Sequence, residues 1–170
     1  VNAVSDFTLT FSWDVDLANV TYDSVSFAVD GQDSSMQGID FNADGTKMFA
    51  IGLTGDAVYQ YTLSTGFDLS TASYDSVSLS VASQEDLPRG IALSSDGTKF
   101  YITGSRNDNV DQYSMSTAFD LSTASYDSVS LSVIGQTANP YGLTFSPDGT
   151  KMYLSSSTGD FFQYALSTAW

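Results

Sequence analysis

The sequence repeats itself every 52 residues, and this repeat limits the fold more than any other feature. The motif Tyr-Asp-Ser-Val-Ser occurs three times at this spacing, beginning at Tyr22, Tyr74 and Tyr126. The motif Asp-Gly-Thr-Lys, which first begins at Asp44, returns twice at the same interval. The chain is therefore expected to be an array of one structural unit rather than a single irregular domain.

Each repeat divides into four short strands, named A to D in chain order. In the first repeat they are expected at 38–41, 47–51, 57–63 and 76–81. An Asp-Gly pair between strands A and B is a strong signal for a tight hairpin. Four antiparallel strands in a repeat of this length are typical of a β-propeller blade, and no segment shows the 3.6-residue period of a helix. The sequence therefore predicts an all-β fold of propeller blades, with three blade equivalents in the chain.

The predicted blades do not coincide with the chain ends. One domain at 1–170 is expected to contain a partial blade at 1–30 (strands C and D, at about 7–13 and 24–29), a blade at 31–82, a blade at 83–134, and a third blade at 135–170 that lacks strand D. Three blades cannot close a ring, and open sheets expose apolar faces and unpaired edges. Two alternatives follow: two copies join head to tail in a six-bladed ring, or these residues belong to a longer array.

The charge of the chain excludes some partners. The formal net charge is −15, with five basic and 20 acidic residues. Nucleic-acid binding needs clustered cations, and an anionic membrane surface would repel this chain. No apolar stretch approaches the length of a membrane span, so membrane insertion is not expected. An acidic surface with few lysines favours a secreted, cell-surface or virion protein, although the need of turns for Asp explains it equally well.

A family resemblance rests on residues 140–153, which read Pro-Tyr-Gly-Leu-Thr-Phe-Ser-Pro-Asp-Gly-Thr-Lys-Met-Tyr. This segment resembles a blade of the YVTN and lactonase-like propeller families, whose hallmarks are a Pro-x-Gly-hydrophobic strand, a Ser-Pro-Asp-Gly turn and an aromatic strand B. The resemblance extends over three repeats and implies the propeller fold. Enzymes of the lactonase-like families use His, Arg and Glu around the central channel. Only Arg89 and Glu85 could take such parts here, and neither recurs between repeats.

Catalytic and metal-binding residue types are scarce. The chain has no His and no Cys, which excludes the Ser-His-Asp and Cys-His arrangements and His-based metal sites. The adjacent acids Glu85 and Asp86 are interpreted as a solvated loop pair. The chain is therefore predicted not to be an enzyme and to need no cofactor. Calcium is the one metal that its Asp-rich loops could hold, and the densest clusters lie at 14–16 and 108–111.

The connections between strands differ in how closely the repeats agree. The A–B and C–D connections are nearly identical, whereas the D–A and B–C connections vary, and propeller geometry places the two kinds on opposite faces. Variable loops on a rigid scaffold are where recognition usually resides. Gln37, Arg89 and Tyr141 occupy the same place before strand A and should ring the mouth of the channel, and Arg106 lies in a neighbouring loop. Two arginines on the varied face of so acidic a chain favour an anionic or glycan ligand.

These observations favour a non-enzymatic binding or structural module, displayed outside a cell or on a virion, such as an adhesin or tail fibre that meets a glycan or cell-surface ligand. One alternative is a lactonase-type enzyme that acts at the channel mouth through Arg89, Arg106 and carboxylates. Another is an assembly subunit whose exposed strand edges recruit neighbours. An ordered anion or metal in the channel would distinguish the enzyme from the binding module.

Overall fold

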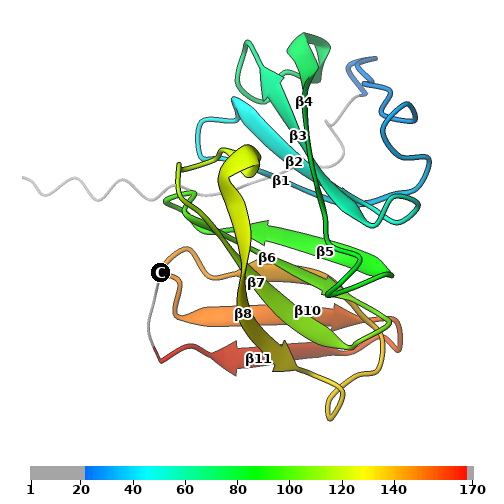
Figure 1. The fold of residues 1–170 in the computed structure, drawn as a ribbon, viewed down its shortest axis with the longest axis vertical. Coiled ribbons are helices and arrows are strands. Elements are labelled where there is room, and N and C mark those ends of the chain that lie inside the picture. The colour runs from blue at the N-terminus through cyan, green and yellow to red at the C-terminus, as the bar shows by residue number, and fades with distance from the viewer. Residues whose placement is uncertain (1–21, 168–170) are drawn as a thin grey trace, which may run out of the picture.

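The computed structural model describes residues 22–167, which form three antiparallel β-sheets stacked one after another along the chain (Figure 1). Two sheets have four strands and the third has three. Helical structure in the described residues is limited to two single turns, η2 (Leu69–Thr71) and η3 (Leu121–Thr123), and none of it is long and apolar enough to cross a membrane. The prediction of an all-β fold made of propeller blades is confirmed.

Within each blade, every strand pairs with its neighbour in the chain. Blade 1 contains β1 (Met36–Phe41), β2 (Lys47–Gly52), β3 (Ala57–Leu63) and β4 (Ala72–Ser80). Blade 2 contains β5 (Pro88–Leu93), β6 (Lys99–Gly104), β7 (Asn109–Met115) and β8 (Ala124–Ser132). Blade 3 contains β9 (Pro140–Phe145), β10 (Lys151–Ser156) and β11 (Phe161–Ala165).

The fourth strand of blade 1 begins at Ala72, earlier than the predicted residue 76, because it pairs with β3 in two registers. Tyr61 lies opposite Tyr74 and Gln60 lies opposite Val77, so the strand contains a bulge between these pairs. Ser76 sits in the bulge with a φ of 59°, a left-handed conformation that re-aims the chain. The strict alternation of apolar and polar residues is interrupted at this bulge, which explains why the predicted strand begins only there, at residue 76.

The segment 22–29, called the N-terminal segment below, includes the strand predicted at 24–29. It is not a strand in the structure, because no strand lies beside it among the described residues, and the strand predicted at 7–13 falls outside them. The N-terminal segment nevertheless has the backbone shape of a fourth strand: Ser24 has a φ of 63°, close to the 59° and 58° of Ser76 and Ser128. Its side chains Phe27 and Val29 pack against the core of blade 1.

Apolar side chains fill the space between blades 1 and 2. Phe49 and Ile51 of blade 1 and Phe100 of blade 2 are fully buried there, and the rings of Phe100 and Tyr113 stack with centroids 4.7 Å apart. Leu121 of η3, only 2% exposed, packs in the same core. Its backbone N–H donates to Oε1 of Gln60 on the preceding blade (2.7 Å). The connection that leads into the last strand of one blade therefore seals the gap to the blade before it.

Candidate functional site at the innermost strands

The first strands of the three blades, β1, β5 and β9, pack against one another and carry a glycine at the same position. A Cβ atom on Gly90 of β5 would lie 2.6 Å from the carbonyl oxygen of Tyr141 on β9, and one on Gly38 would lie 3.1 Å from the carbonyl oxygen of Arg89. Side chains at these positions would push the strands apart. The glycines therefore let the innermost backbones approach, so that the preceding residues of each strand come close together.

Those preceding residues are Gln37, Arg89 and Tyr141, and they meet in a cavity of about 250 Å³. Nη1 of Arg89 donates to Oε1 of Gln37 (2.8 Å), and Nε donates to Oγ of Ser105 (3.2 Å). The guanidinium carbon lies 4.9 Å from the centre of the Tyr141 ring, a cation–π distance. The structure brings these three residues together at this cavity, called the mouth below, and their role in binding stays a prediction.

Arg89 carries a positive charge that no carboxylate balances in the part of the chain that the structure describes. The ion pairs found there join Lys47 to Asp75, Lys99 to Asp127 and Arg106 to Asp86. Gln37 and Ser105 hold Arg89 through neutral groups and engage Nε and Nη1. The guanidinium is thus fixed in place with its charge available, an arrangement suited to a carboxylate or phosphate.

Arg106 does not join this cluster. It lies in the loop between β6 and β7, its side chain is 62% exposed, and its Nε donates to Oδ1 of Asp86 (3.1 Å). It is absent from the residues that line the cavity. Arg106 thus pairs with Asp86 outside the cavity, although its neighbour Ser105 bonds to Arg89, and its role in binding stays a prediction.

Glu85 is buried, which corrects its interpretation as one of a solvated pair. It is 1% exposed and accepts backbone N–H groups from Leu87 (2.8 Å), Arg106 (3.1 Å) and Asn107 (3.0 Å). The carboxylate therefore joins the D–A connection to the B–C connection of blade 2. This role is structural, and Glu85 is not among the residues that line the mouth.

Asp33 has the same role in blade 1, where it accepts N–H groups from Ser35 (2.8 Å) and Gly55 (2.7 Å). Burial alone would raise the pKa of Asp33, but these bonds, with those from Thr54, outweigh it and hold the pKa below its usual value. The D–A connections looked unrelated in sequence, yet an acid follows Val29 and Val81 at the same distance. This shared position of an acid in the sequence indicates the carboxylate that joins the D–A connection to the B–C connection in both blades.

The cluster at 108–111, one of the two candidates for calcium, contains a buried carboxylate. Asp111 is 3% exposed, and Oδ1 accepts a long bond from the Tyr126 hydroxyl (3.3 Å), while Oδ2 has no partner among the described residues. Burial raises the pKa of Asp111 to about 6. Within 22–167 no three acidic, His or Cys side chains converge as metal ligands, and the cluster at 14–16 lies outside this range. The cluster at 108–111 therefore does not bring three carboxylates together as a calcium site would.

The side chains that line the mouth could recognise a ligand, but none of them could act as a general base. Its nine lining residues include the guanidinium of Arg89, the amide of Gln37 and the aromatic ring of Tyr141, and no carboxylate. The remaining lining residues are the strand glycines and the apolar side chains that follow them. These groups can bind an anion and stack on a ring. A general base for hydrolysis would have to come from outside this cavity.

Comparison with known proteins shows likeness in structure only, since no protein-family model and no curated protein sequence matches the chain. Two similar structures are a "putative 6-phosphogluconolactonase" from Bacteroides uniformis (TM-score 0.58) and another from Bacteroides fragilis (TM-score 0.56), each 16% identical over 78% of this chain. Hydrazine synthase of Kuenenia stuttgartiensis is 17% identical over 81% of the chain, with a TM-score of 0.54. This chain spans 37%, 38% and 33% of these three chains.

The prediction that the chain is not an enzyme is contradicted by this comparison, because two of the structures with its fold are named lactonases. The absence of His and Cys excludes particular mechanisms, but hydrolysis of a strained cyclic ester needs only a base and a group that stabilises negative charge. At these identities the likeness establishes the fold and no family: the chain has the propeller-type fold that these structures share.

Proposed function

We propose that the chain forms part of a lactonase-type propeller enzyme whose channel mouth binds an anionic substrate through Arg89. The observation that carries the proposal is the position of Arg89, which neutral partners fix beside the Tyr141 ring without a balancing carboxylate in the described residues. Support comes from the two Bacteroides structures, whose names specify a phosphorylated sugar lactone. Because this chain covers little more than a third of either one, the activity is proposed for the complete ring.

The mouth residues divide the recognition of such a substrate between them. The guanidinium of Arg89 binds the anionic group, since its planar donors match phosphate and carboxylate oxygens. The ring of Tyr141, 41% exposed, offers an apolar face to the sugar. Gln37 holds the guanidinium from the side, so that less conformational freedom is lost when the anion binds.

In the reaction, water attacks the lactone carbonyl carbon, the ring C–O bond breaks, and the departing ring oxygen takes up a proton to become a hydroxyl. The negative charge that develops on the carbonyl oxygen is what a fixed cation can stabilise. Arg89 is assigned to the substrate's own anionic group, so the base and the charge-stabilising donor are left to residues outside the mouth.

Arg89→Ala should weaken the binding of 6-phosphogluconate by about 10- to 100-fold, which corresponds to about 1.4 to 2.7 kcal/mol. Titration calorimetry measures this directly, and hydrolysis of 6-phosphogluconolactone supplies the parallel activity readout. Arg106→Ala is the matched control, because it removes the same charge from an exposed ion pair away from the cavity. Its effect should stay within about twofold. Equal losses in both variants, or wild-type protein that neither binds nor hydrolyses, would refute the proposal.

A further inference from the structure

Blade 3 has an open edge where the other blades have a fourth strand. Strand β11 pairs with β10 on one side, and no strand pairs with its other side among the described residues. The equivalent strand of blade 2, β7, pairs with β8, which places Gln112 opposite Val129. Gln163 corresponds to Gln112 but is exposed, and the neighbouring Phe161 is 84% exposed. An apolar strand edge of this kind is normally covered.

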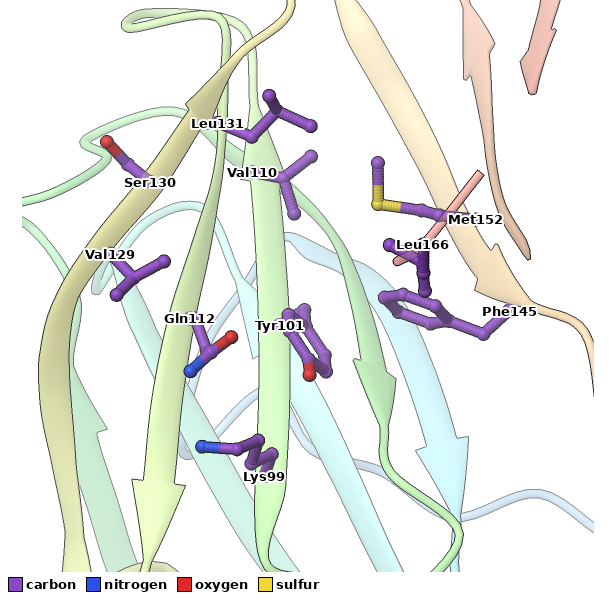
Figure 2. A pocket seen from close by; sticks show the side chains of 10 residues that line it. All are labelled: Lys99, Tyr101, Val110, Gln112, Val129, Ser130, Leu131, Phe145, Met152 and Leu166. Carbon is purple, nitrogen blue, oxygen red and sulfur yellow. The ribbon is translucent and has the colours of Figure 1, made fainter. Parts of the chain in front are cut away.

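A cavity of about 530 Å³ lies between blades 2 and 3, next to this edge (Figure 2). Val129 and Leu131 on its wall are 51% and 44% exposed, and Met152 faces them from blade 3. At the same place between blades 1 and 2, Leu121 fills the space and its N–H bonds to Gln60. The cavity therefore lies where the preceding interface holds a connection and a fourth strand.

A repeated charge cluster shows which residues the missing strand should carry. In blade 1, Asp75 of the Tyr-Asp-Ser-Val-Ser motif accepts from Lys47 Nζ (2.9 Å) and Gln60 Nε2 (2.7 Å). In blade 2, Asp127 has the same position in the motif and accepts from Lys99 Nζ (3.2 Å) and Gln112 Nε2 (2.6 Å).

Blade 3 presents the two donors of this cluster, Lys151 and Gln163, at the equivalent positions. Within residues 22–167 neither side chain is joined to an aspartate. An extended segment that places a carboxylate between them would complete the pattern of the other two blades.

The N-terminal segment carries the complementary residues. It contains the third copy of the motif, and its Asp23 is exposed and accepts only the N–H of Val25 (3.3 Å) among the described residues. Its Ser24 already adopts the left-handed conformation of the fourth-strand bulge. The turn that follows is also that of a fourth strand, since Asp33 N–H bonds to the Val29 carbonyl as Glu85 N–H bonds to that of Val81. The segment is thus shaped for a strand partner that blade 1 does not supply.

We propose that β11 of one copy of this chain pairs with the N-terminal segment of a second copy, so that Asp23 of the second copy accepts from Lys151 and Gln163 of the first. The segment stays packed on its own blade 1 and bridges two molecules. Two such contacts related by a two-fold axis join two half-rings into one closed ring of six blades. The inference concerns assembly and goes beyond the proposed binding of an anion.

The internal repeat also fixes the register of this contact. By analogy with β7 and β8, Gln163 should lie opposite Val25, and Phe161 opposite Phe27, which covers the exposed ring.

Sedimentation equilibrium of the 170-residue chain should give a mass of about twice 18.2 kDa. Asp23→Lys and Lys151→Asp should each raise the dissociation constant of the dimer at least about tenfold, and both changes in one chain should restore it to within about threefold. Asp30→Lys, which makes the same charge change at an exposed site outside the motif, should leave the mass unchanged. A wild-type mass of one chain, or of open oligomers larger than two, would overturn the proposal.

A second measurement does not depend on how the charge variants fold. The chain has no cysteine, so Val25→Cys combined with Gln163→Cys introduces the only two thiols. Mild oxidation should link two chains covalently at these opposed positions, visible on a non-reducing gel. Pairing Val25→Cys with Ser157→Cys in the distant β10–β11 loop should leave the chains unlinked. Equal linkage in both pairs, or linkage in neither, would contradict the proposed register.

Discussion

Replacing Glu85 with alanine should lower the free energy of unfolding by about 3 to 5 kcal/mol. The substitution leaves the N–H groups of Leu87, Arg106 and Asn107 in a buried site without their acceptor, and it opens a small cavity where the side chain lay. Loss of one such acceptor is costly, and here one carboxylate serves three donors from two connections. Urea titration followed by circular dichroism measures the change.

Asp86→Ala is the control for this experiment, because it removes the adjacent charge from a side chain that is 43% exposed and pairs with Arg106 at the surface. It should lower stability by no more than about 1 kcal/mol. Equal destabilisation by both substitutions would show that the change in net charge, rather than the loss of the three hydrogen bonds to Glu85, lowers the stability.

Asp111→Asn should raise the free energy of unfolding at pH 7 by about 1 to 3 kcal/mol, because it removes a carboxylate that must be charged inside a blade interface. Burial holds the pKa of Asp111 at about 6, above the ordinary value of 3.8. The folded state thus binds the proton more tightly than the unfolded state does. Its stability rises as pH falls from about 7 towards 4, and the penalty is fully present above the folded pKa.

The difference between wild type and variant isolates this group from the other acids. From pH 7 to pH 5 the wild-type chain should gain about 1.4 kcal/mol through Asp111, and the asparagine variant should lack that gain. Glu85→Ala, which keeps Asp111, should retain a pH-dependent gain of the same sign. A variant with the same pH dependence as the wild type would show that Asp111 ionises normally in the fold.

The repeat made the fold predictable, since Asp-Gly turns and alternating strands are local signals that three copies reinforce. The meeting of Gln37, Arg89 and Tyr141 was predictable for the same reason, because equal positions in equivalent strands must converge on a common axis. Arg106 could not be placed in this way. Its loop differs in sequence between the repeats, so no equivalent residue in another blade indicates where its side chain lies.

The burial of Glu85 and Asp111 could not be predicted from the residues near them in the sequence. Glu85 stands among polar neighbours, and two of its three donors, at Arg106 and Asn107, come from another loop. Asp111 occupies the position of Tyr59 in blade 1 and of Phe162 in blade 3, a core position where an acid replaces an aromatic ring. Aligning the copies strand by strand, rather than scanning for acidic clusters, would have revealed its burial.

The near-identity of the fourth strands has a consequence for how the chain reaches its native state. Ser76 and Ser128 form the same bulge in the same nine-residue sequence, so β4 would match β7 almost as well as β8 does. Local energetics therefore do little to reject such an exchange between blades. What selects the native partner is chain entropy: residues 64–71 alone separate β3 from β4, and closing that short loop is faster and less costly than closing one across a whole blade. Lengthening this connection should thus slow folding and populate exchanged, mispaired species before it disturbs the final structure.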